Sequence, residues 1–199
     1  MSFILLVEQA APETPSANQV VFYPKSDGLL YSKDDAGTER LVSAGGITLA
    51  TEVASTSGTA IDFTGIPAGT DRIVVMFFGV STNSTSNYLV QIGDSGGIEA
   101  SGYVSSAQTD TAARVTSTAG FIITSSIGAT NPISGMVILT LEDSTANTWI
   151  GISNVSDSGG VGQYGQGHKT SLDTALTQVR ITTVSADTFD AGALNITYE

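Results

Sequence analysis

The sequence predicts an all-β protein, in which an N-terminal arm and a small β-meander precede a β-sandwich or jelly-roll-like domain. Three observations lead to this fold class. Short apolar runs recur roughly every 10 to 20 residues, with Ser, Thr, Gly and Asn between them. Several runs alternate apolar and polar residues with the period of two that is typical of half-buried strands, as in residues 137–142. No segment shows the 3.6-residue apolar repeat of an amphipathic helix.

Residues 1–45 differ in composition from the remainder and form the first predicted unit. They hold three of the five prolines and carry charges of both signs. A five-residue apolar run, 3–7, has no basic residue before it and is followed by Glu8, which is not the pattern of a secretory signal peptide. We expect this run to be an arm that docks on another protein through Phe3, Ile4, Leu5 and Leu6.

A three-stranded β-meander is predicted within this unit, because turn signals separate three short apolar runs. The turns contain Asp27-Gly28 and residues 34–37, and the runs are residues 19–25, 29–33 and 38–42. A sheet of this size cannot bury both of its faces by itself. We therefore expect it to pack against other copies of itself or against another protein, and the residues expected to meet other copies are Val21, Phe22, Leu30 and Tyr31.

Residues 46–199 form the second predicted unit, the sandwich, which begins after a Gly-rich boundary. β-Branched residues are frequent in its apolar runs, as in strands generally. Trp149 is expected in its core. The predicted strands are residues 59–63, 72–80, 88–93, 102–105, 120–124, 134–142, 148–155, 178–183 and 193–198.

Composition excludes several classes of function. The chain has 199 residues and no cysteine, so it has no disulfide or thiolate metal site, and its single histidine, His168, excludes sites with several histidines. Seven Lys and Arg against 19 Asp and Glu give a net charge of −12, which disfavours binding to nucleic acid or to an anionic membrane. The longest apolar run, residues 73–80, is too short to span a bilayer as a helix.

A Gly-rich stretch at residues 160–165 matches the G-x-G-x-x-G pattern of dinucleotide-binding proteins. No helical pattern follows it, so no cofactor is expected there and the stretch is predicted to be a loop. His168 could act as a base, yet no Gly-x-Ser-x-Gly elbow supplies a nucleophile. The polar residues of this predicted loop are instead candidates for contacts with a receptor: Tyr164, Gln166, His168 and Lys169.

Paired carboxylates, as in glycosidases, are the remaining catalytic possibility. Glu142 and Asp143 are adjacent at the end of a predicted strand, so their side chains should diverge. Asp94, Glu99 and Asp110 lie in predicted loops that could approach one another, and we interpret them as solvated acids. No Asp-x-Asp-x-Asp-Gly loop for calcium is present. We therefore expect neither an enzyme nor a metal site.

Two stretches resemble proteins of tailed-bacteriophage virions and prophages. Residues 12–39, which contain P-x-x-P and then Y-x-K-x-D-G-x-L-Y-x-K-D-x-x-G-T-E, are similar to a segment near the N-termini of phage fibre proteins. Residues 88–103, with 179–183 and 187–199, are similar to a β-domain that recurs in those proteins. The resemblance implies a protein of the virion surface, commonly a homotrimer, and carries over no catalytic residue.

Three functions compete for such a protein. The first is a capsid decoration, cement or head-fibre protein that binds the major capsid protein or other virion proteins and stabilises the shell. The second is a short tail fibre that recognises a host-surface glycan or protein, and the third is a glycan-degrading enzyme. Because residues 1–45 provide little room for an attachment domain and a shaft, the capsid role is favoured, although a fibre built from several chains would remove this argument.

Overall fold

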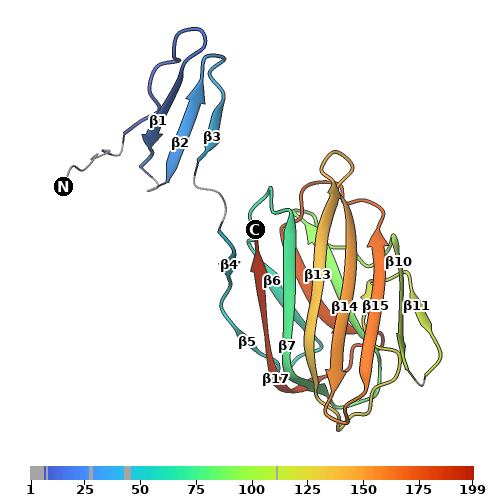
Figure 1. The fold of residues 1–199 in the computed structure, drawn as a ribbon. Helices are drawn as coiled ribbons and strands as arrows, with labels where there is room; N and C mark the ends of the chain where they lie inside the picture. Colours follow the sequence, from blue (N-terminus) through green and yellow to red (C-terminus); the bar gives the residue numbers. More distant parts are fainter. Residues whose placement is uncertain (1–6, 8, 27–28, 43–45, 111) are drawn as a thin grey trace. The chain divides into compact units, whose positions relative to one another are not determined.

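The computed structural model describes residues 7, 9–26, 29–42, 46–110 and 112–199, and the chain divides into two compact units, Met1–Gly46 and Ile47–Glu199. The described residues of both units form antiparallel sheets and include no helix, which confirms the all-β class (Figure 1).

The first unit is a three-stranded meander in the order β1-β2-β3. Its strands are β1 (Val20–Pro24), β2 (Leu30–Asp34) and β3 (Glu39–Leu41). Tyr23 lies opposite Tyr31, and the buried Tyr23 ring is 6.2 Å from the Tyr31 ring, measured between centroids. The segment before β1 is tied to the sheet, because Lys33 Nζ donates a 2.8 Å hydrogen bond to the Pro12 carbonyl oxygen.

The second unit contains two sheets. The larger, nine-stranded sheet has the order β11-β10-β15-β14-β13-β7-β17-β4, with β5 also paired to β17. Its strands are β4 (Thr48–Leu49), β5 (Val53–Ala54), β7 (Arg72–Thr82), β10 (Tyr103–Thr109), β11 (Val115–Ser117), β13 (Ile133–Asp143), β14 (Thr148–Asp157), β15 (Gly162–Lys169) and β17 (Phe189–Tyr198). The smaller sheet has the order β12-β8-β16-β6, with β9 paired to β8. Its strands are β6 (Ala60–Thr64), β8 (Tyr88–Asp94), β9 (Gly97–Ile98), β12 (Phe121–Ile122) and β16 (Gln178–Thr183).

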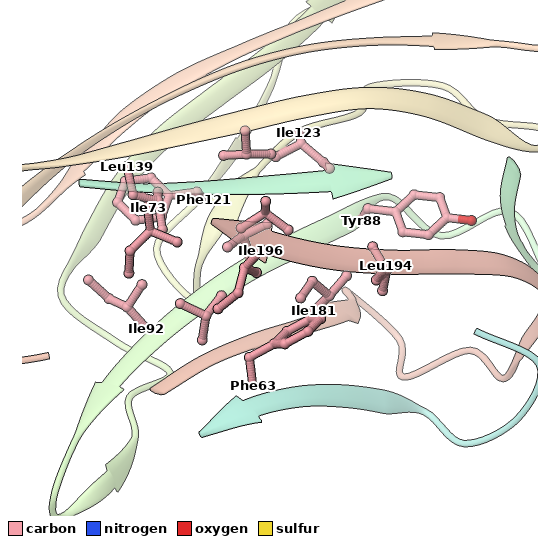
Figure 2. Packing of buried hydrophobic residues seen from close by; sticks show 14 of the residues in the cluster. Phe63, Ile73, Tyr88, Ile92, Phe121, Ile123, Leu139, Ile181, Leu194 and Ile196 are labelled. Atoms are coloured by element: carbon pink, nitrogen blue, oxygen red, sulfur yellow. The ribbon is translucent and has the colours of Figure 1, made fainter. Parts of the chain in front are cut away.

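Side chains from both sheets of the second unit share one core. Ile73 and Leu139 come from the large sheet and Ile92 and Ile181 from the small one, and all four are fully buried in the same cluster (Figure 2). Trp149 also lies there, as expected. Burial of apolar area between two sheets is what holds a sandwich together. The β-sandwich is therefore confirmed, whereas the expected jelly-roll order is not.

Candidate functional site

The outer face of the large sheet, which points away from this core, carries an exposed apolar surface. The register aligns Ile152 of β14 with Ile138 of β13, and Ile138 with Val74 of β7. Ile152 is 54% exposed and Phe78 is 77% exposed. A solvated sheet face is normally polar, so a continuous apolar surface of this kind is unusual on the outside of a sheet. We call it the aliphatic patch, and it consists of Val74, Met76, Phe78, Met136, Ile138, Ile150 and Ile152.

Small residues occupy the inward positions in the middle of the neighbouring strands β14 and β15, namely Gly151, Ser153, Gly165 and Gly167. Strand β12 of the other sheet approaches there so closely that side chains would not fit. A Cβ atom on Gly151 would lie 2.7 Å from the Phe121 ring, and one on Gly165 would lie 2.7 Å from the Ile122 carbonyl oxygen. Ile150 and Ile152 of β14 alternate with these small residues and therefore face outward, whereas Trp149 near the start of the strand points into the core.

Residues 162–169 form strand β15, so the prediction of a loop for this Gly-rich segment was wrong. β15 pairs along its whole length with β14 on one side and mostly with β10 on the other. Glycine weakens a strand because it offers no side chain to pack and loses more entropy on folding, which concealed β15 in the sequence. Hydrogen bonds to two neighbours outweigh that weakness. Tyr164, Gln166 and His168 project outward from β15, as the period of two requires.

Lys169 points the other way and is not a surface residue. It is 3% exposed, and its Nζ lies 2.6 Å from a Glu99 carboxylate oxygen. Nζ also donates to the Ser171 carbonyl oxygen and sits 5.6 Å from the centroid of the Tyr103 ring. Lys169 therefore serves an internal ion pair and cannot contact a receptor in this fold.

A polar hollow of about 170 Å³ lies beside the aliphatic patch, on the outer face of β10 and β15. Gln108 is opposite Tyr164, and Ser106 is opposite Gln166. Arg114 comes one residue before β11, and continuing the β10–β11 register places it beside Gln108. The side chains of Gln108, Gln166 and Arg114 are exposed and make no hydrogen bond or ion pair with any described residue. We call this hollow the Arg114 pocket, and it is formed by Ser106, Gln108, Arg114, Tyr164 and Gln166.

The Tyr164 ring lies along its own strand. Gly162 is two residues away on the same face, and a Cβ atom there would be 2.5 Å from the Tyr164 hydroxyl oxygen and 2.9 Å from ring atom Cζ. The ring therefore lies over Gly162, where a larger residue would displace it. Tyr164 remains 42% exposed, so this aromatic surface is available at the side of the pocket.

The meander residues predicted to meet other copies lie on both faces of their sheet. Phe22 and Leu30 share one face, whereas Val21 and Tyr31 share the other, because cross-strand partners point the same way. Phe22 is 57% exposed and Val20, beside it on that face, is exposed as well. The Phe22 face is thus the one with apolar area left for a contact.

The Tyr31 face is occupied by interactions inside the unit. Glu39 accepts a 2.6 Å hydrogen bond from the Tyr23 hydroxyl and forms a 2.5 Å ion pair with Lys25. Lys25 Nζ also lies 4.3 Å from the centroid of the Tyr31 ring. Hydrogen bonds from Lys25 and Tyr23 hold the pKa of the Glu39 carboxyl below its ordinary value. This polar cluster orders the meander from within.

Four of the acids considered for catalysis have structural partners, namely Asp94, Glu99, Glu142 and Asp143. Asp94 accepts hydrogen bonds from the backbone N–H groups of Gly96 and Thr174 at 2.7 and 2.8 Å, which close a turn. Burial opposes ionisation of Asp94, yet these donors outweigh it and lower its pKa. Glu142 accepts from the Thr148 hydroxyl.

Asp143 accepts from the N–H groups of Thr145 and Ala146, and Glu99 pairs with Lys169. Among the described residues, no three acidic or histidine side chains gather as a possible metal site. Nor does the described part of the chain include a helix long and apolar enough to cross a membrane. The predicted docking residues Phe3, Ile4, Leu5 and Leu6 lie outside the described residues.

Sequence reasoning missed most of the Arg114 pocket and all of the aliphatic patch. Ser106, Gln108 and Arg114 follow a strand that was predicted to end at residue 105. The signal for the patch was present, since Ile150 and Ile152 alternate with small residues, but alternation does not say which side faces the core.

No family model, curated protein or solved structure matches this chain.

Proposed function

We propose that the chain is a structural protein of a tailed-phage virion that assembles as a homotrimer and binds the major capsid protein or other virion proteins, as a capsid decoration, cement or head-fibre protein. The exposed apolar area in each of its two units is the observation that carries the proposal. The resemblance of residues 12–39 to a segment of phage fibre proteins supplies the virion context.

The meander supports assembly because one of its faces exposes apolar side chains that the rest of the unit does not cover. Val20 and Phe22 expose more than half of their surface on a sheet of three short strands. Sheets this small need further apolar burial for stability. Three copies around one axis would supply it, because each Phe22 face would meet its equivalent in the next copy.

The aliphatic patch also supports contact between copies of this chain. The protein carries a net charge of −12, so two copies repel each other wherever acidic surfaces approach. The seven residues of the patch carry no charge, and contact between two such patches would desolvate none there. Copies of this chain are therefore suitable occupants of the patch. In this proposal the chain acts by binding and not by catalysis.

Native mass spectrometry or light scattering at micromolar concentration tests the assembly. We expect a particle with three times the chain mass of 20.4 kDa. A monomer at that concentration would contradict the proposal. Imaging of labelled or deletion virions then tests the location, because a cement protein should be distributed over the head and its loss should make the particles burst more easily on heating.

A second candidate function is a short tail fibre that recognises a host-surface glycan or protein. The Arg114 pocket favours it, since exposed amide groups, a guanidinium and an aromatic ring converge there without partners among the described residues. Density confined to the tail and loss of adsorption on deletion would support this function over the capsid role.

A further inference from the structure

We propose that the Arg114 pocket binds a sugar residue that carries a carboxylate, such as a uronic or sialic acid. The inference deepens the second candidate function and rests on it for its biological role, whereas the binding site itself does not depend on trimer formation. The site is formed by Ser106, Gln108, Arg114, Tyr164 and Gln166.

The size and the lining of the hollow favour a single sugar ring. Its volume of about 170 Å³ is below the roughly 300–1,000 Å³ that accommodates drug-sized ligands. The exposed Tyr164 ring at one side can stack on the apolar C–H face of a pyranose, as aromatic residues in small-molecule sites commonly contact apolar ligand surfaces. The ring has room to lie over the strand in this position because Gly162 has no side chain.

The polar groups of the pocket match vicinal hydroxyl groups. Gln108 and Gln166 each offer a carbonyl acceptor and an NH₂ donor, and Ser106 adds a hydroxyl that can do both. Ser106 lies opposite Gln166 on the adjacent strand, and Gln108 is two residues further along β10 from Ser106, on the same face. Neither glutamine side chain forms a hydrogen bond with another described residue. A polyhydroxylated ligand is the class that uses donors and acceptors in such alternation.

The positive charge of the pocket favours an acidic ligand. Arg114 is the one charged residue in its lining, in a protein with 19 acidic and seven basic residues, and it forms no ion pair with any described residue. A guanidinium binds a carboxylate through two parallel hydrogen bonds, which a lysine cannot reproduce. A phosphate-rich ligand would require more cations or several converging backbone N–H groups, so a sugar acid fits better.

Titration of the isotope-labelled full chain with D-glucuronate or N-acetylneuraminate, followed by backbone and glutamine side-chain NMR shifts, tests the site. We expect shifts at residues 106–108, 114 and 164–166. The methyl ester of glucuronate and glucose should bind at least ten-fold more weakly, because they lack the carboxylate. Absence of shifts at these positions with both acids at 20 mM, or equal affinity for glucose, would overturn the inference.

Four substitutions locate the interaction. Arg114→Ala should weaken binding at least ten-fold and Arg114→Lys several-fold, whereas Arg40→Ala, which removes the same charge from the other unit, should leave it unchanged. Gly162→Ala should weaken binding several-fold by displacing the Tyr164 ring, with an otherwise unchanged spectrum. If Arg40→Ala weakens binding of the sugar acid as much as Arg114→Ala does, the loss of affinity reflects the net charge of the protein, and the assignment of the Arg114 pocket as the binding site is wrong.

Adsorption measurements separate the site from the function. Particles carrying Arg114→Ala that lose both sugar binding and adsorption would support both. Sugar binding that is lost without any change in adsorption would retain the site and overturn the receptor role. Adsorption that depends on the protein, in a chain that binds neither sugar acid, would overturn the site and retain the receptor role.

Discussion

The Lys169 ammonium nitrogen lies 2.6 Å from a Glu99 carboxylate oxygen, and the lysine side chain is almost fully buried. This pair joins the end of strand β15 to the segment after β9. Lys169 donates to the Ser171 carbonyl as well, so its charge is compensated on two sides. Removal of the carboxylate would leave a buried ammonium group without its counter-charge.

We predict that Glu99→Ala lowers the free energy of unfolding by about 3 kcal/mol, as expected when a buried ammonium group loses its counter-charge. Chemical denaturation measures the change. The exposed Asp62–Arg180 pair provides the comparison, because both of its side chains are about one-third accessible. Asp62→Ala should cost no more than about 1 kcal/mol. Equal losses in the two variants would contradict the structural role of the Lys169 pair.

Gly165 is predicted to tolerate no side chain. A Cβ atom there would meet the Ile122 backbone, which cannot rotate away, so Gly165→Ala should lower the free energy of unfolding by about 2–3 kcal/mol through overpacking. Gly46→Ala serves as the control, since nothing lies within 4 Å of a Cβ atom at that position. A neutral Gly165→Ala would mean that β12 and β15 lie further apart than described.

Stability should depend on pH through Asp94. Its pKa is lowered in the folded state, so its ionised form stabilises the fold above the ordinary Asp value of 3.8, and this contribution disappears as the pH falls towards the lowered folded-state pKa. Asp94→Asn should therefore be less stable than the natural chain at pH 7, with a difference that shrinks below about pH 4. Thermal unfolding from pH 7 to pH 2.5 measures this. A difference independent of pH would show that the charge of Asp94 is not what stabilises its turn.

The aliphatic patch should matter for assembly and not for folding. Ile152→Thr and Phe78→Thr remove apolar surface that each side chain already exposes to water, so each should change the free energy of monomer unfolding by less than about 0.5 kcal/mol. Together they should raise the concentration at which the trimer dissociates at least ten-fold, as measured by sedimentation. Val104→Thr, an exposed apolar residue on β10 outside the patch, is the matched control. Unchanged assembly in the double variant would remove the patch from the proposed contact.

The sequence alone determined the fold class and most of the strands. Alternation in residues such as 137–142, and β-branched runs such as 178–183, reflect the two-residue period of a strand, which is a local property. The turns of the meander were likewise local, because Asp-Gly steps favour tight turns between strands. Local backbone preference is visible in one chain without knowledge of its neighbours.

The tertiary structure alone decided which face of each strand is buried and which residues meet. Strand β15 exists because β10 and β14 both supply hydrogen bonds to a Gly-rich segment with little strand preference of its own. Lys169 turns inward because Glu99 lies there, and Arg114 and Tyr164 line one pocket because β10 pairs with both β11 and β15. Such contacts join residues tens of positions apart, and their energy depends on strand order and register, which alternation along a single strand does not encode.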